Sequence, residues 1–316
     1  MELDNVTISG GFAYTVGPPT QATAGWYGMD SNLQRQMFAN DTATASYRGS
    51  LPITVSRAAG TFTLDYGWIT GGVTGLYSAV QRITFANDTA SASIRGSLTL
   101  PVYAHAGTGN STAGWYAGGG IGAPTYGQTS TVQRITYATD TANSSIRGPL
   151  TSARYSGAAA GTSTDGWFMG GVSPAYSALA SVNRITYAND NVTASARANM
   201  SISQYDPAAC SDGTTYAWVG GGGNDGSPPY LSLVQRIIFA TDTAAATSRG
   251  PLSQARFRLS STQNTTDGWF AGGALNGFDR SSRIDRITFA TDTNTASIRG
   301  PLFAASYAGV GLSGVA

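Results

Sequence analysis

Arginine and aspartate recur together at fixed spacing in this chain, and they are the residues best placed to do chemistry. One motif occurs six times, with an arginine at its start, an aspartate six residues later and a second arginine thirteen residues after the first. The last copy lies within SRIDRITFATDTNTASIRGPL, residues 282–302. Such a triple could bind an anion through two guanidinium groups, or it could form an internal ion pair.

Two uses of the triple are open: a ring of six anion sites, or one structural salt bridge or backbone clamp per copy. We favour the structural use, because a ligand site rarely needs six scaffold copies. The triples are Arg35, Asp41 and Arg48; Arg82, Asp88 and Arg95; Arg134, Asp140 and Arg147; Arg184, Asp190 and Arg197; Arg236, Asp242 and Arg249; and Arg286, Asp292 and Arg299.

Side-chain alternation gives the second copy a predicted geometry. If residues 87–88 form the tip of a hairpin, Arg82 faces Ser93 and lies on the same face as Arg95. The aromatic residue and the two isoleucines of this copy, Phe85, Ile83 and Ile94, then cover the other face. One face would be an apolar interface, and the other would carry arginine with serine and threonine.

The chain has few residues that could support other kinds of chemistry. The chain contains one cysteine, Cys210, one histidine, His105, and one glutamate, Glu2. No disulfide framework, metal cluster or acid/base set can be assembled from these residues. His105 and Cys210 fall in small-residue strands, where buried packing roles are expected. Calcium at the ANDT and ATDT segments is disfavoured, since one carboxylate among hydroxyls is too few ligands and Asn-Asp is ordinary turn chemistry. We predict no cofactor, no metal and no enzymatic activity.

The elements that carry the motif repeat with it. The repeat length is 47 to 52 residues, and each unit reads as four short strands, which is the content of one propeller blade. A tryptophan marks the second strand of every unit, at Trp26, Trp68, Trp115, Trp167, Trp218 and Trp269. The sequence predicts an all-β, six-bladed propeller as a single domain over residues 1–316. The predicted blades are about 1–50, 51–100, 101–149, 150–200, 201–251 and 252–301.

The C-terminal segment, 302–316, supplies one strand more than six blades need. Tyr307 aligns with Tyr155 and Tyr103 at the start of a first strand, and Tyr14 marks another at the N-terminus. The last strand could complete the first blade or pair with another chain. We expect closure of the ring, because closure removes exposed sheet edges. Small residues in 157–161 and 308–314 suit the crowded axis of such a ring.

The repeat resembles that of Kelch β-propellers, over nearly the whole chain. ARYSGAAAGTSTDGWFMGG followed by SVNRITYA has the small-residue strand, the strand ending in Gly-Gly and the third strand of that family. The fourth-strand tryptophan of the Kelch pattern is replaced here by small residues and arginine. The STDGW and TTDGW segments also resemble the turns of sialidase propellers. A sialidase site would need an arginine triad with Glu and Tyr, and the single glutamate at the N-terminus makes that untenable. Galactose-oxidase chemistry would need two His and a Tyr-Cys pair, which one His and one Cys exclude.

The near-identity of the RITFATDT and TASIRGPL segments, rich in Gly, Ser and Thr, also resembles repeat-bearing virion proteins of tailed phages, including tail and fibre components. That resemblance implies a place on the surface of an extracellular particle. It also implies other virion proteins or a host-surface glycan as partners, with homo-oligomers possible inside an assembly.

Loops between the second and third strands vary most between units, and variable loops on a rigid scaffold are where binding usually resides. Five of them carry one aromatic residue among Gly, Ser and Asn, a composition that resembles antibody paratopes. Either the aromatics form a recognition face, or each packs onto its own blade. They are Tyr77, Tyr126, Tyr176, Tyr230 and Phe278.

Charge and hydropathy argue against a nucleic-acid-binding protein and against a membrane-spanning one. All eighteen basic residues are arginine and the formal charge is +1, so no electrostatic footprint for nucleic acid is present. No segment approaches the ~20 apolar residues of a membrane span, and no signal peptide is apparent. We therefore predict a non-catalytic structural and recognition module on a virion. A free-standing carbohydrate-binding propeller lectin is the alternative.

Overall fold

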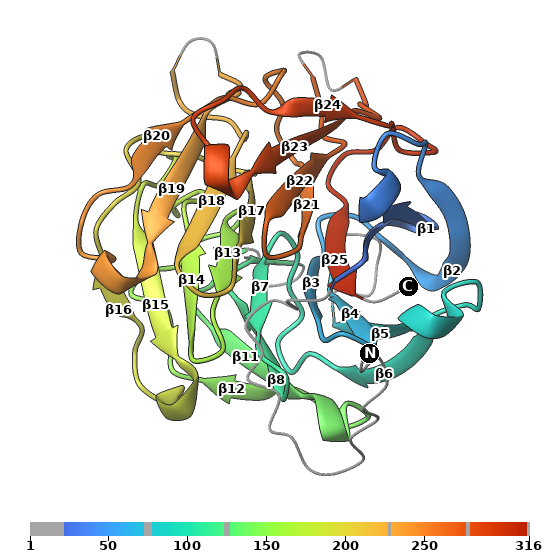
Figure 1. Ribbon diagram of the computed structural model, residues 1–316. Coiled ribbons are helices and arrows are strands. Elements are labelled where there is room, and N and C mark those ends of the chain that lie inside the picture. The colour runs from blue at the N-terminus through green and yellow to red at the C-terminus, as the bar shows by residue number, and fades with distance from the viewer. Residues whose placement is uncertain (1–21, 73–77, 123–126, 227–228, 276–278, 315–316) are drawn as a thin grey trace, which may run out of the picture.

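The computed structural model describes residues 22–72, 78–122, 127–226, 229–275 and 279–314, and it forms a ring of six blades around one axis (Figure 1). Five blades, the second to the sixth, are four-stranded antiparallel sheets. The sheet of the first blade has the order β2-β1-β25. The predicted six-bladed β-propeller is confirmed.

Each complete blade runs from the axis to the rim in chain order. In the second and third blades the strands are β3 (Ala59–Phe62), β4 (Tyr66–Thr70), β5 (Ala79–Thr84) and β6 (Ser93–Ser97), then β7 (Ala106–Gly109), β8 (Ala113–Ala117), β11 (Val132–Thr136) and β12 (Ser145–Arg147). In the fourth and fifth they are β13 (Ala158–Gly161), β14 (Asp165–Met169), β15 (Val182–Thr186) and β16 (Ser195–Arg197), then β17 (Ala208–Ser211), β18 (Tyr216–Gly220), β19 (Val234–Ile238) and β20 (Thr247–Arg249). The sixth blade contains β21 (Ser260–Gln263), β22 (Asp267–Ala271), β23 (Ile284–Thr288) and β24 (Ser297–Arg299). A small ribbon of β9 (Gly120–Ile121) and β10 (Gly127–Gln128) stands on the third blade.

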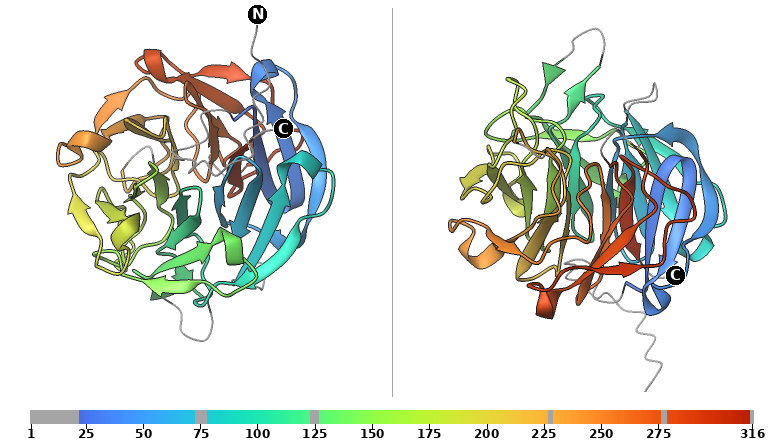
Figure 2. Two further views of the ribbon diagram at one scale, coloured as in Figure 1. Left: turned by 60° about the horizontal axis from the view of Figure 1, so that its bottom comes forward. Right: turned by 90° about the horizontal axis from the view of Figure 1, so that it is seen from above.

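The ring is closed by the C-terminal strand, as predicted. β25 (Val310–Gly314) pairs with the first part of β1 (Ala24–Met37), with Trp26 opposite Leu312. The second part of β1 pairs with β2 (Ser46–Val55), so β1 fills two strand positions of the first blade. Figures 1 and 2 show the red C-terminal strand beside the blue N-terminal blade. No other chain is needed to seal this blade.

Glycine pairs end the second strands, because the backbone there turns into the left-handed region that favours glycine. In the fourth blade Gly170 and Gly171 have φ values of 64° and 101°. The chain then returns as β15, which places Arg184 opposite Trp167. This register brings the tryptophan and the first motif arginine of every complete blade side by side.

The connection between third and fourth strands differs from the predicted hairpin. In the second copy Phe85–Asn87 forms a 3-10 turn and the fourth strand starts only at Ser93. Arg82 does pair with Ser93. Ile94 is 59% exposed, so its predicted place in the apolar interface is wrong. It lies on the outermost strand, where the blades have diverged from the axis and leave that face uncovered. The 3-10 turns are η1 (Phe38–Asn40), η2 (Phe85–Asn87), η3 (Tyr137–Thr139), η4 (Tyr187–Asn189), η5 (Phe239–Thr241) and η7 (Phe289–Thr291).

The core lies between blades rather than within one. Trp115 of the third blade packs in one cluster with Phe168, Ile185 and Tyr187 of the fourth. Its ring stacks on that of Tyr187 at 4.0 Å between centroids. Each blade therefore buries its apolar face only against its neighbour, which is the usual dependence among repeats.

Candidate recognition site

The Arg-Asp-Arg motif forms a clamp between neighbouring blades, and we use "clamp" for this group throughout. The Asp140 carboxylate, from the third blade, accepts a hydrogen bond from Trp68 Nε1 of the second at 2.8 Å. It also lies 3.0 Å from Arg82 Nη1 and 3.5 Å from Arg95 Nε, both of the second blade. The Gly96 amide donates to the Asp140 carbonyl at 2.8 Å. One aspartate is thus held by three side chains of the preceding blade.

The same clamp occurs at all six junctions, including the one where the chain closes. There Asp41 accepts from Trp269 at 2.9 Å and lies 3.0 Å from Arg286 Nη1 and 3.4 Å from Arg299 Nε. The remaining clamps join Asp88 to Trp26, Arg35 and Arg48; Asp190 to Trp115, Arg134 and Arg147; Asp242 to Trp167, Arg184 and Arg197; and Asp292 to Trp218, Arg236 and Arg249.

The clamp geometry shows what these residues do. The six aspartate side chains are only 5–7% exposed, and the arginines hold them from the adjacent blade. Spacing within one copy could not reveal that the partners belong to neighbouring copies, nor that the tryptophan is the third donor. These residues therefore position the blades.

A second ring surrounds one end of the axis, at the connections that lead from the rim back to the inner strands. Six residues there, none of them glycine, have φ between 50° and 59°. Each donates its amide to the carbonyl of the preceding member at 2.6–2.8 Å, so the hydrogen bonds run head to tail around a closed circle. We call this circle the mouth. Its members are Arg57, Ala104, Ser156, Asp206, Arg258 and Ala308.

Charged side chains gather at the mouth. Arg57 Nη2 donates to Ser156 Oγ at 2.6 Å and lies 3.5 Å from Asp206. Arg258 Nε lies 3.1 Å from the other oxygen of the same carboxylate. Two guanidinium groups therefore share one aspartate, around a hollow of about 70 Å³. A left-handed backbone costs of order 1–3 kcal/mol per residue, and such strain concentrates at functional sites.

Aromatic residues precede five of the six mouth positions. Tyr103, Tyr155, Tyr205 and Tyr307 are half-buried, and Phe257 is buried. The Arg57 guanidinium lies 5.6 Å and 5.5 Å from the ring centres of Tyr103 and Tyr155, within reach of a cation–π attraction. Partial burial raises the pKa of Tyr155 and of Tyr205. These phenols therefore stay neutral, and each can donate or accept a hydrogen bond.

The variable loops open on the same face as the mouth, because the loops follow the second strands, the mouth connections follow the fourth strands, and these two strands run in the same direction. Tyr176 is 78% exposed and has a φ of 60°. Tyr230 instead stacks on Phe257, 4.5 Å between ring centres. Tyr176 is therefore exposed, whereas Tyr230 packs against the connection that leads into the sixth blade. A recognition face built from these aromatics stays a prediction. Tyr77, Tyr126 and Phe278 lie outside the described residues.

Sequence reasoning did not predict the mouth, although it aligned Tyr103, Tyr155 and Tyr307 at the starts of first strands. Each of these tyrosines directly precedes a mouth residue, which is the residue in the left-handed conformation. Only the assembled ring shows that these positions meet.

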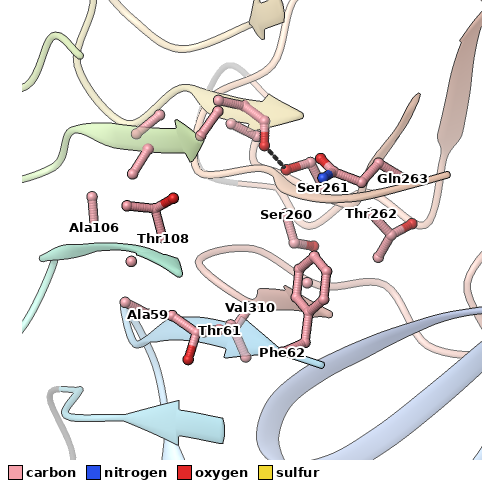
Figure 3. Close-up of a pocket in the computed structure, with 18 of the residues that line it drawn as sticks. Ala59, Thr61, Phe62, Ala106, Thr108, Ser260, Ser261, Thr262, Gln263 and Val310 are labelled. Atoms are coloured by element: carbon pink, nitrogen blue, oxygen red, sulfur yellow. Dashed lines mark hydrogen bonds between the residues drawn. The ribbon is translucent and has the colours of Figure 1, made fainter. Parts of the chain in front are cut away.

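Small side chains line the channel behind the mouth, a space of about 180 Å³ (Figure 3). Ala59, Thr61, Ala106 and Thr108 face it from neighbouring inner strands. The channel is too narrow for bulky side chains, which explains why the inner strands are rich in small residues.

The lone histidine and cysteine are buried, as predicted. His105 Nε2 lies 2.9 Å from Thr70 Oγ1, and burial lowers the pKa of His105 from 6.5 to about 3. Burial raises the pKa of Cys210. Both groups are thus held neutral. Across the described ranges no three His, Cys, Asp or Glu side chains are grouped so as to hold a metal ion.

Among the residues that the structure describes, none of the helices has the length and apolar character needed to cross a bilayer.

No protein-family model and no curated protein matches the chain in sequence. A solved structure described as "Structure of YjhT" has the same architecture, with a TM-score of 0.68 and 13% sequence identity. The match covers 83% of this chain and 88% of that one. At this identity the likeness establishes the propeller fold alone.

Proposed function

We propose that the chain is a non-catalytic recognition module that binds a host-surface glycan at its mouth. One observation carries this proposal: Arg57, Arg258 and Asp206 line a hollow within a pre-formed circle of backbone hydrogen bonds, and half-buried tyrosines flank that circle. Concave sites with a few precisely placed polar groups are the usual form of small-ligand sites. Tyr176 stands on the same face and would extend the contact.

The chemistry of the mouth suits a saccharide. Aromatic rings offer apolar faces to the C–H surface of a sugar, while phenols and guanidinium groups supply hydrogen bonds. A fixed backbone circle would lower the entropy lost on binding. The carboxylate of Asp206 is already shared by Arg57 and Arg258, so we assign it to orienting these arginines.

We further propose that this module belongs to a tailed-phage virion, as a tail, fibre or surface component with a Kelch-like repeat. This rests on the sequence resemblance of the repeat. A free-standing carbohydrate-binding lectin is the second candidate. The closure of the first blade by β25 favours it, because the described strands of that blade leave no position that a neighbouring virion chain must fill.

A glycan array with the intact chain tests the mouth as the binding site. We expect selective binding that falls at least tenfold in Tyr155→Ala and in Tyr205→Ala. The control is Ile94→Ala, an exposed change on the outer rim. Equal loss in all three variants, or binding unchanged in the two tyrosine variants, would rule out the mouth.

A further inference from the structure

One position contacts the first arginine of the clamp in four of the six blades. It lies two residues before the tryptophan, at or near the start of the second strand. In the fourth and sixth blades it is an aspartate: Asp165 lies 3.8 Å from Arg184 Nε, and Asp267 lies 3.6 Å from Arg286 Nε.

Tyrosine takes the same position in the second and fifth blades. The guanidinium carbon of Arg82 lies 4.7 Å from the centre of the Tyr66 ring, and that of Arg236 lies 4.4 Å from the Tyr216 ring. In these four blades the side chain at this position therefore meets the guanidinium, either as an ion pair or as a cation–π contact.

The third blade has Ala113 there, and a groove opens beside its clamp. The groove has a volume of about 600 Å³, whereas the corresponding groove beside Tyr66 has about 390 Å³. Arg134 and Trp115 lie in its wall. The volume falls within the range of roughly 300–1,000 Å³ that small-ligand sites occupy.

Arg134 is partly exposed beside this groove. Its side chain is 28% exposed, close to the 29% of Arg184, and its Nη1 pairs with Asp190 at 3.0 Å. Its Nε has no hydrogen-bond acceptor, which is also true of the first arginine in four other clamps. Arg134 differs from Arg184 and Arg286 in that its own blade supplies no aspartate to face it. The clamp also contains a second arginine, Arg147, so two cations share one carboxylate. An additional carboxylate would be attracted to this place.

Hydroxyl groups surround the arginine. The groove is lined by Thr112, Thr136, Ser163, Thr164 and Thr186, from both blades that form it. Thr112, Thr136 and Thr186 are exposed. Thr164 and Thr186 donate to Asp165, and Thr112 donates to Asn110, so these hydroxyls offer their oxygens as acceptors to the O–H groups of a polyhydroxylated ligand.

We propose that the groove between the third and fourth blades binds the carboxylate of an acidic sugar, with Arg134 as its cationic partner. The carboxylate replaces the one that Asp165 supplies to Arg184 in the next blade. The threonine and serine hydroxyls contact the sugar ring. The groove is built from the turns after the first and third strands, so it lies on the face opposite the mouth. The proposal is independent of the function assigned to the mouth.

Isothermal titration with D-glucuronate tests the groove, with D-glucose as the neutral control. We expect saturable binding of one glucuronate per chain and at least tenfold weaker binding of glucose. Ala113→Asp should reduce glucuronate affinity at least tenfold, because the new carboxylate pairs with Arg134 as Asp165 does with Arg184. The fold already accepts this pair in two blades.

Ala24→Asp is the matched control, since Ala24 occupies the same position in the first blade, where Arg35 is only 17% exposed. It should leave binding unchanged. Ala113→Tyr, which reproduces the contact of Tyr66 with Arg82, repeats the test if the aspartate variant does not fold. The proposal is overturned if glucuronate shows no saturable binding, if glucose binds equally well, or if the change at Ala113 leaves the affinity intact.

Discussion

At the scale of single residues, the clamp explains the exclusive use of arginine. Asp140 is held by an indole and two guanidinium groups, which approach it through different nitrogens: Nε1 of Trp68, Nη1 of Arg82 and Nε of Arg95. A lysine offers a compact ammonium rather than a planar fork and is more strongly hydrated, so it fits a partly buried site less well. The ion pair itself could be predicted from sequence. Its crossing from blade to blade could not, because repeats of equal spacing give no information on which copies touch.

Replacing a clamp carboxylate should destabilise the whole ring. Asp140→Asn leaves Arg82 and Arg95 without their anion, and we expect the free energy of unfolding to fall by roughly 3 kcal/mol. Asp165→Asn removes a carboxylate from a partly exposed pair and should cost about 1 kcal/mol or less. Urea denaturation of both variants measures the difference. Equal effects would show that the clamp is not a buried structural pair.

His105 should make stability depend on pH. Its pKa is lowered from 6.5 to about 3, so the folded state keeps it neutral while the unfolded chain takes up a proton below pH 6.5. Stability is therefore complete above pH 6.5 and is lost as pH falls towards 3, by about 1.4 kcal/mol per pH unit.

The matched variant is His105→Ala, since the second blade has Ala58 in the equivalent place. Between pH 6.5 and 5, wild type should lose about 2 kcal/mol more than this variant in chemical denaturation. Parallel pH profiles for the two proteins would contradict the assignment.

At the scale of elements, four strands per repeat and closure by the last strand could be predicted, because β-branched alternation and turn residues are local signals. The 3-10 turns could not, since Phe85–Asn87 looks like the continuation of a strand in sequence. The turn directs Phe85 onto Trp26 of the preceding blade, where the rings stack at 4.0 Å. Packing against a neighbour therefore decides the local conformation.

Removing the closing strand should open the ring. A chain ending at Ala308 lacks β25, which leaves β1 with an unpaired edge and uncovers the core residues that pack against Val310 and Leu312. We expect a lower melting temperature and self-association, measured by thermal unfolding and size-exclusion chromatography. A chain ending at Gly314 is the control and should behave as the full chain. A stable monomer after loss of β25 would show that closure is dispensable.

At the scale of the molecule, the residues that hold the blades together are distinct from those that form the mouth. The clamps use twelve of the eighteen arginines and hold the blades, while the mouth uses the positions that follow Tyr103, Tyr155 and Tyr205. The variability of the loops predicts the loop face as the site of contact, and this stays a prediction. The mouth could not, because six residues spaced by a whole repeat become neighbours only when the ring closes.

The central claim is that the mouth face is the recognition surface of a particle-borne propeller. A cryo-EM reconstruction of the assembled particle tests it most directly. We predict a six-bladed ring whose mouth, with Arg57, Asp206 and Arg258, faces outward to solvent and is open to a glycan. A particle without this ring, or a ring whose mouth is buried against another virion protein, would contradict the claim.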